Sequence, residues 1–291
     1  MLGECLTLTQ DPRCGRPPIC DRPAARAELA RESLPYATSL SDAEWAVLAP
    51  LLPAPSSTGR PWRRPRRAVV DGILSVLRTG CAWRHLPLDF PPWSTVHRWF
   101  LRLSQTGVFE RLAHALTLVD RERVGREACP TGCVVDAQAA RSGGVGVAGK
   151  RGYDPARRVV GRKRHALTDT DGRLLVAAVS PADLHDSHGA IALLRASRGL
   201  FPFLAHCFAD RAYRGERVGA ATTITVEIVE PKGGQKGFAV QPRRWVIERS
   251  FGWIARCRRL ARDHEATPSS ALAFFVLAAA MILVRRIARA L

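Results

Sequence analysis

The sequence predicts a mixed α/β protein in which a short helical region precedes a larger sheet-containing core. Up to about residue 125 the apolar residues recur with helical spacing, whereas beyond Cys129 short β-branched runs alternate with helical segments. The 291 residues are 46% hydrophobic, which is enough to bury a full core. We therefore expect a loose extension over residues 1–38, a helical region over 39–125, and an α/β core with C-terminal helices over 126–291.

The helical region is expected to contain four helices. Ser41 and Glu44 form a capping box that begins the first helix, and Gly80 ends the second. Ser94 or Thr95 can cap the third. The expected spans are about 42–52, 67–79, 94–104 and 108–120.

The third helix presents a basic face made of His97, Arg98 and Arg102. Three short helices with a basic last member resemble a helix-turn-helix arrangement, in which the final helix enters the major groove of DNA. A helical packing or dimerisation module with a solvated basic face has the same pattern. The helical region on its own leaves these two interpretations open.

The core is expected to begin with strands. "GCVVDAQ" is a short apolar run that ends in Asp136, and the two runs around Asp171-Gly172 are a strong hairpin signal. "FLAHCFAD" predicts a buried strand ending in Asp210. The remaining expected elements are a helix at 190–198, a strand in "TITVEIVEP", a helix that carries Glu248, and a buried helix at 271–284.

Charge and composition narrow the classes of function. Lys and Arg total 44 against 26 acidic residues, a surplus of +18 that favours a polyanionic partner such as nucleic acid. The eight cysteines lack paired CxxC spacing, so we expect no structural zinc. The opening residues lack a signal-peptide pattern, and the apolar run at 271–284 is too short to span a bilayer. We expect a cytoplasmic protein with no membrane partner.

Three carboxylates are candidates for a metal site. Asp136 and Asp210 each end an apolar strand, where a charge is costly unless the strand opens into a site. If the two strands are neighbours, the aspartates meet, and Glu248 can join them from a helix. Mutually repelling carboxylates favour Mg²⁺ or Mn²⁺, and a pair of such ions suits attack on a phosphodiester. Alternatively, each aspartate is a turn or helix cap, and Glu248 pairs with Arg244 along its helix.

Several ordered motifs resemble one family. "VVDAQ", "GRKRH", "DTDG", "PADLHD", "FADRAYRG" and "RRWVIERSFGWIARCRRL" look like the core of bacterial insertion-sequence transposases of the DDE class, in the group named after insertion sequence five. "LSDAEWAVLAPLLP" and "PWSTVHRWF" are similar to that group's helical N-terminal region. The resemblance implies a ribonuclease-H-like fold with Asp136, Asp210 and Glu248 as the catalytic triad, holding two Mg²⁺ or Mn²⁺ ions. The interval 248 − 210 = 38 leaves no room for the large β insertion of some relatives.

The family signature around the glutamate is only half present. Arg244 and Glu248 fit it, whereas Gln241 and Ala255 stand where the family has tyrosine and lysine. On a continuous helix, Arg259 lies within about 40° of Glu248. We expect Arg259 to supply the phosphate contact of the missing lysine.

Other basic and polar residues are secondary candidates for DNA contact. Arg256 points about 80° away from Glu248 and is expected to contribute less than Arg259. Lys163 and Arg164 either face the active-site groove or make an edge strand soluble. The acidic and histidine cluster at 183–186 is expected to be a turn and helix cap, and the glycine-rich 142–149 a connection near DNA.

Together these features predict a DNA transposase. Its helical region would bind the terminal inverted repeats of an insertion sequence, and its core would cleave the ends and transfer them to target DNA. Two ends require two active sites, so a homodimer or larger assembly is expected on DNA. The alternatives are an inactive or repurposed DNA-binding derivative and an ordinary metal-dependent nuclease; the intact triad disfavours the first, and the helical region disfavours the second.

Overall fold

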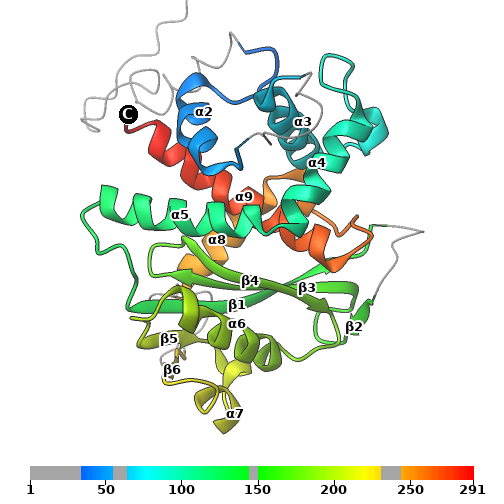
Figure 1. The fold of residues 1–291 in the computed structure, drawn as a ribbon. Helices are drawn as coiled ribbons and strands as arrows, with labels where there is room; N and C mark the ends of the chain where they lie inside the picture. The colour runs from blue at the N-terminus through cyan, green and yellow to red at the C-terminus, as the bar shows by residue number, and fades with distance from the viewer. Residues whose placement is uncertain (1–33, 55–63, 144–149, 231–243) are drawn as a thin grey trace, which may run out of the picture.

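A mixed sheet separates two groups of helices in the computed structural model, which describes residues 34–54, 64–143, 150–230 and 244–291 (Figure 1). The N-terminal helices, α5, α8 and α9 lie on one side of the sheet, and α6 and α7 lie on the other (Figure 1). The extension predicted at 1–38 falls mostly outside the described residues. The sheet order is β2-β3-β1-β5-β6, with β4 also paired to β3.

The N-terminal helices largely follow the predicted spans. The capping box is confirmed, since Ser41 Oγ accepts from Glu44 N at 3.2 Å and Glu44 Oε2 accepts from Ser41 N at 3.1 Å. Gly80 ends its helix with φ 73°, a left-handed conformation that suits glycine. Neither Ser94 nor Thr95 caps the third helix, which follows Pro92 directly. The elements are α2 Asp42–Leu48, η2 Ala49–Leu51, α3 Arg66–Thr79, η3 Trp83–His85, α4 Trp93–Gln105 and α5 Val108–Arg123.

The sheet is built around β1, which pairs antiparallel with β3 and parallel with β5. The hairpin predicted at Asp171-Gly172 is confirmed as β3–β4, with Gly172 at φ 93°. The prediction that the first strand ends at Asp136 is wrong, because pairing with β3 continues as far as Arg141. The strands are β1 Gly132–Arg141, β2 Gly152–Asp154, β3 Val159–Asp169, β4 Leu174–Pro181, β5 His206–Ala209 and β6 Thr225–Ile228.

The C-terminal half supplies the helices that cover the sheet. They are α6 Asp186–Leu200, η4 Arg211–Tyr213, α7 Glu216–Gly219, α8 Trp245–Ala255, η5 Arg258–Leu260 and α9 Pro268–Ala288. Within the described residues, α9 alone is long and apolar enough to cross a membrane, but 72% of its apolar window is buried inside the protein. The predicted buried C-terminal helix is therefore confirmed as a core helix.

Two hydrophobic clusters fill the space on either side of the sheet. The larger one joins the N-terminal helices to α5, α8, α9 and one face of the sheet. At its centre Phe100 of α4 stacks on Phe274 of α9, with ring centroids 4.3 Å apart. The smaller cluster lies between the other face and α6. The helical region thus shares its core with the C-terminal helix.

A buried ion network fixes the β3–β4 hairpin against the helices. Arg173 Nε lies 2.7 Å from Asp120 Oδ2 of α5, and Arg121 lies 2.6 Å from Asp169 of β3. Arg286 of α9 also reaches Asp120, at 3.1 Å. The hairpin end is therefore held by charge pairs as well as by apolar packing.

Candidate active site

Asp136 and Asp210 lie at the same level on neighbouring parallel strands. Val134 of β1 is the Cα partner of Phe208 of β5, and both aspartates follow two residues later (136 = 134 + 2, 210 = 208 + 2). Asp210 directly follows β5, as predicted, whereas Asp136 stands within β1. The two strands are therefore neighbours, which was the condition for the two aspartates to meet.

Backbone hydrogen bonds orient both carboxyl groups. Asp136 Oδ1 accepts from Ala137 N at 2.7 Å, and Asp210 Oδ1 accepts from Ala212 N at 2.8 Å as the N-cap of η4. The cap interpretation therefore holds for Asp210. It does not exclude metal binding, because a carboxylate keeps further lone pairs when one oxygen accepts a backbone N–H.

The electrostatic setting of Asp136 opposes its negative charge. Burial first, and then the nearby charge of Asp210, raise the pKa of this carboxyl to about 6. The hydrogen bond from Ala137 and the charges of Arg244 and Arg157 act in the opposite direction. A cation placed between the two aspartates would relieve both the repulsion and the cost of burial.

Glu248 does not reach the aspartate pair directly. It lies in the first turn of α8, its side chain is 47% exposed, and its Oε1 accepts from Arg244 NH2 at 2.8 Å. The predicted alternative, an i,i+4 ion pair with Arg244, is therefore formed. In the part of the chain that the structure describes, no three Asp, Glu, His or Cys side chains form a group able to hold a metal ion. Arg244 links Glu248 to the aspartate pair, since its charge also acts on Asp136.

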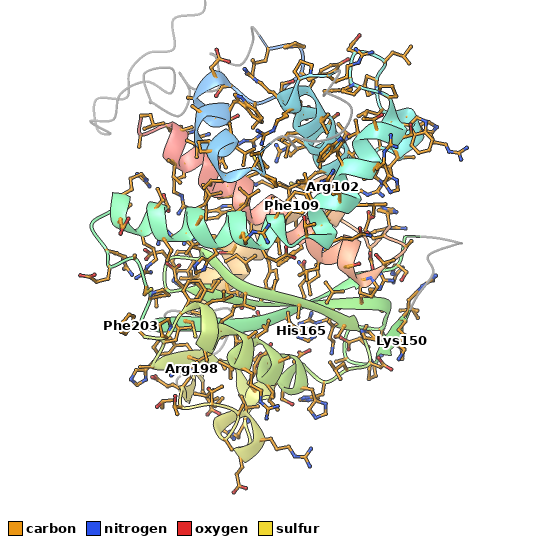
Figure 2. All side chains as sticks on the ribbon, in the orientation of Figure 1. Arg102, Phe109, Lys150, His165, Arg198 and Phe203 are labelled. Carbon is orange, nitrogen blue, oxygen red and sulfur yellow. The ribbon has the colours of Figure 1, made fainter. Side chains whose placement is uncertain are left out.

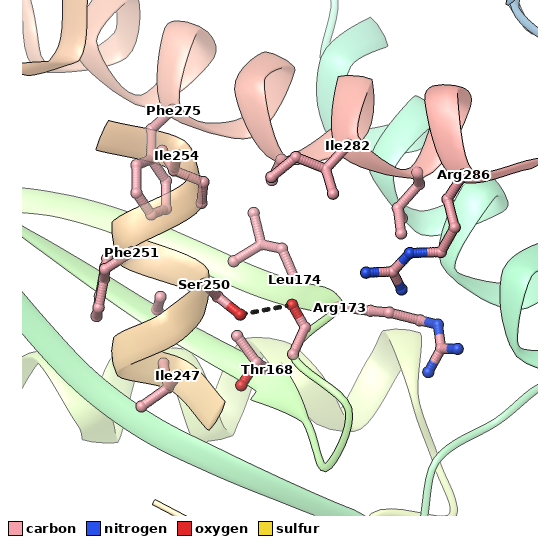
Figure 3. Close-up of a pocket in the computed structure, with 14 residues that line it drawn as sticks. Thr168, Arg173, Leu174, Ile247, Ser250, Phe251, Ile254, Phe275, Ile282 and Arg286 are labelled. Atoms are coloured by element: carbon pink, nitrogen blue, oxygen red, sulfur yellow. Dashed lines mark hydrogen bonds between the residues drawn. The ribbon is translucent and has the colours of Figure 1, made fainter. Parts of the chain in front are cut away.

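Helix α8 is anchored against the hairpin that follows β3 (Figure 3). Ser250 Oγ donates to Gly172 O at 2.8 Å. A Cβ atom at residue 172 would stand only 2.5 Å from Ser250 Oγ. Glycine is therefore needed for this close approach. The apolar face of α8 lines a small pocket beneath α9, and it consists of buried residues: Ile247, Phe251 and Ile254.

The helical-face argument for a DNA contact of Arg259 is wrong. The helical-wheel argument required α8 to continue past Ala255, but the helix ends there and Arg259 lies in η5. Arg259 is 8% exposed, with its Nε 2.6 Å from Glu265 Oε1 and its NH1 3.1 Å from Cys81 O. Arg256, which was expected to contribute less, is exposed.

Both interpretations of Lys163 and Arg164 are also corrected. β3 is flanked by β1 and β4, so it is not an edge strand, and the two residues are 7% and 3% exposed rather than open to a groove. Lys163 Nζ pairs with Asp186 at 2.9 Å, and Arg164 NH1 donates to Leu260 O at 2.7 Å. Burial lowers the pKa of Arg164 to about 10. The next residue, His165, lies in the same sheet layer (Figure 2).

The polar cluster at 183–186 forms a helix cap, as predicted. His185 is the N-cap of α6 and accepts from Ser187 N at 3.3 Å, and Asp186 pairs with Lys163. Two other sequence predictions cannot be placed, since most of the glycine-rich connection and Gln241 lie outside the described residues.

The basic face of α4 is divided between interior and surface. The His97 ring packs in a tilted arrangement against Trp83, with ring centroids 4.8 Å apart, and burial lowers its pKa, so His97 belongs to the packing. Arg98 and Arg102 are exposed, and the guanidinium of Arg102 lies 5.0 Å from the Trp99 ring centroid (Figure 2). Two of the three predicted DNA contacts thus remain on the surface.

Sequence reasoning missed two residues beside the aspartate pair. Arg157 donates from NH1 and NH2 to Ala137 O, at 3.0 Å each, and its charge lowers the pKa of Asp136. Tyr213 is 1% exposed, and its hydroxyl has no hydrogen-bond partner among the described residues. Its pKa is raised by burial and by charges that include Asp136 and Asp210. Tyr213 stood within the quoted "FADRAYRG", whereas no spacing rule singled out Arg157.

Comparison with known proteins agrees with this geometry. Residues 40–113 match a family model described as "Putative transposase of IS4/5 family", and residues 127–283 match one described as "Transposase DDE domain". Two relatives come from Burkholderia cepacia. "Insertion element IS402 uncharacterized 16.2 kDa protein" is 37% identical over 113 residues, which cover 37% of this chain and 76% of the relative.

The second relative, "Putative transposase for insertion sequence element IS402", is 29% identical over 121 residues, which cover 38% of this chain and 57% of the relative. No solved structure matches. The second family model covers more than half of the chain, including both aspartates and Glu248. The chain therefore belongs to the DDE-domain transposases of insertion sequences, a family of metal-dependent DNA transposases.

Proposed function

We propose that Asp136, Asp210 and Glu248 act together as the catalytic triad of a transposase that cleaves the ends of an insertion sequence and transfers them to target DNA. The observation that carries the proposal is the parallel register of β1 and β5, which sets the two aspartates side by side. Paired carboxylates carried by neighbouring parallel strands, on a chain of net charge +18, suit a polyanionic substrate held through cations.

The residues present fit a divalent cation. Carboxylate oxygens are the preferred ligands of Mg²⁺ and Mn²⁺, and the raised pKa of Asp136 marks a position where a cation would stabilise the charged form. Glu248 is 47% exposed, so its ion pair with Arg244 contributes only about 0–1 kcal/mol. Rotation of Glu248 toward the aspartates therefore costs little. When bound, two ions would activate water and stabilise the leaving oxygen of the phosphodiester.

Basic residues around the carboxylates would bind the DNA. Once Glu248 turns to the aspartates, Arg244 loses its partner on α8 and becomes available to a phosphate oxygen. Arg256 lies exposed just beyond the end of the same helix. On the helical region, Arg98 and Arg102 are the exposed candidates for contact with the terminal repeats. Since two ends are cut, we expect a dimer or larger assembly on DNA.

The test uses a duplex that carries the terminal repeat, as found in the DNA beside the gene. Asp136→Asn, Asp210→Asn and Glu248→Gln should each abolish cleavage and strand transfer in Mg²⁺ and in Mn²⁺ while binding to the duplex is retained. Each amide keeps the shape of the side chain but removes a charge from the cation site. Asp183→Asn, an exposed carboxylate in the turn before α6, is the matched control and should cleave like wild type.

Wild-type-like cleavage by any one of the three variants would remove that residue from the triad. Full activity of the wild type in excess chelator would exclude the metal mechanism. If the wild type binds terminal repeats but cleaves in neither ion, the alternative holds, and this copy is a DNA-binding derivative of a transposase.

A further inference from the structure

Arg157 lies on a turn that the fold holds rigidly. The turn connects β2 to β3, and Asp154 Oδ1 accepts from the backbone N–H groups of Ala156 at 3.0 Å and of Arg157 at 3.1 Å. Asp154 is itself 4% exposed, and its second oxygen lies 3.5 Å from Lys163 Nζ. The backbone of Arg157 is therefore positioned by a buried carboxylate.

The guanidinium of Arg157 is also fixed. Its NH1 and NH2 both donate to Ala137 O at 3.0 Å, which orients the plane of the group. A guanidinium has five N–H donors, so about three remain after these two bonds. Arg157 is exposed, and within the described segments none of these remaining donors has a hydrogen-bond acceptor. The residue is a solvent-facing cation attached to the strand that carries Asp136.

We propose that Arg157 binds the phosphate that is to be cleaved and positions it at the aspartate pair. Ala137, to which the guanidinium is bonded, directly follows Asp136, so a phosphate held over the two aspartates lies within reach of the free donors. The planar fork of arginine matches two phosphate oxygens. Arg244 is occupied by Glu248 before DNA binds, whereas Arg157 is oriented in advance. This inference rests on the function proposed above.

Arg158 provides a charge-matched control. It follows Arg157 in the same turn and is exposed, but its side chain makes no hydrogen bond or ion pair within the described residues. Its φ of 51° marks a strained position where alanine is no more strained than arginine. Replacing either arginine with alanine therefore removes the same net charge, but only Arg157 is directed toward Asp136.

The experiment measures binding of full-length protein to terminal-repeat duplexes in which single phosphates are replaced by neutral methylphosphonates. With the wild type, neutralising the phosphate at the cleavage position should weaken binding about tenfold, the loss of one charge-assisted contact. Arg157→Ala should weaken binding to the unmodified duplex by a similar factor and should be insensitive to the methylphosphonate at that position. Arg158→Ala should stay sensitive to it, as the wild type is.

Three further outcomes decide the proposal. If Arg157→Ala remains as sensitive to the methylphosphonate as the wild type, Arg157 does not contact that phosphate. Arg157→Lys should bind better than Arg157→Ala yet cleave slowly at saturating DNA, because a point charge does not keep the oriented fork. If Arg157→Lys and the wild type cleave equally fast, Arg157 contributes only its positive charge and does not position the phosphate. This experiment measures how DNA binding by each variant responds to the methylphosphonate. The proposal for Arg157 can therefore hold even if the triad variants disprove the proposed catalytic role, and it can fail while the triad holds.

Discussion

At Asp136 two opposing effects decide the charge of the carboxyl group. Burial and the neighbouring Asp210 disfavour the anion, while Arg244, Arg157 and the Ala137 N–H stabilise it. The result is a pKa of about 6 against an ordinary value of 3.8. The folded metal-free protein therefore binds a proton at Asp136 more tightly than the unfolded chain does. This proton contributes stability that is fully present below pH 3.8 and is lost as the pH rises through about 6.

Asp136→Asn should consequently stabilise the metal-free protein at neutral pH. A shift of about two pKa units corresponds to about 2–3 kcal/mol, which the charged aspartate costs the fold above pH 6 and which asparagine avoids. Urea unfolding at pH 8 in chelator should show the variant more stable than wild type, and the difference should shrink as the pH is lowered toward 4. A variant that is less stable than wild type at pH 8 would mean that Asp136 carries no such strain.

At the scale of elements, helices were easier to predict than strands. The capping box at Ser41 and the stop at Gly80 are local signals, so α2 and α3 could be located without tertiary information. β1 was expected to end at Asp136 because an acidic residue usually ends a buried run. It continues to Arg141 because β3 supplies partners along its whole length, which no local pattern reveals.

The candidate site shows the same division. The order of apolar strands and aspartates predicted that Asp136 and Asp210 meet if their strands are neighbours, and the parallel pairing of β1 with β5 meets that condition. The basic run "GRKRH" was misinterpreted, since its charges are satisfied by Asp154, Asp186, Asp263 and main-chain carbonyls. The fixed orientation of Arg157 likewise depends on Ala137, twenty residues earlier in the chain.

The end of α8 leads to a prediction that separates stability from DNA binding. Arg259 in η5 forms a buried pair with Glu265, and removal of one partner from such a pair costs about 3–5 kcal/mol. Arg259→Ala should therefore lower the free energy of unfolding by that amount. Arg256→Ala, at an exposed position, should change stability by less than about 0.5 kcal/mol and weaken DNA binding instead. Urea unfolding measures the stability of both variants, and titration with duplex measures their DNA binding. If Arg259→Ala weakened DNA binding more than Arg256→Ala did, a DNA contact for Arg259 would be restored.

At the scale of the whole molecule, the main feature is that one hydrophobic cluster crosses the boundary between the helical region and the α/β core. Leu48 of α2 and Phe100 of α4 belong to the same cluster as Phe274 of α9 and Val134 of β1. DNA recognition and catalysis would then be built on one rigid unit. An end bound by the helical region would be presented to the carboxylates in a fixed orientation.

This shared core predicts that the two parts cannot fold separately. A fragment of residues 1–125 lacks α9, and a fragment of residues 126–291 exposes the face of α9 on which Phe100 packs. Each large apolar side chain left in water loses about 1.5–3 kcal/mol of stabilisation. Several such losses exceed the free energy of unfolding of a typical domain, which is about 5–15 kcal/mol. Circular dichroism during urea titration should therefore show one cooperative transition for the full chain and none for either fragment. Mixing the fragments should restore helical signal, because the missing face is supplied in trans. A cooperative transition in fragment 1–125 alone would show instead that the helical region is an independent domain, and the rigid link between DNA recognition and catalysis would then have to be abandoned.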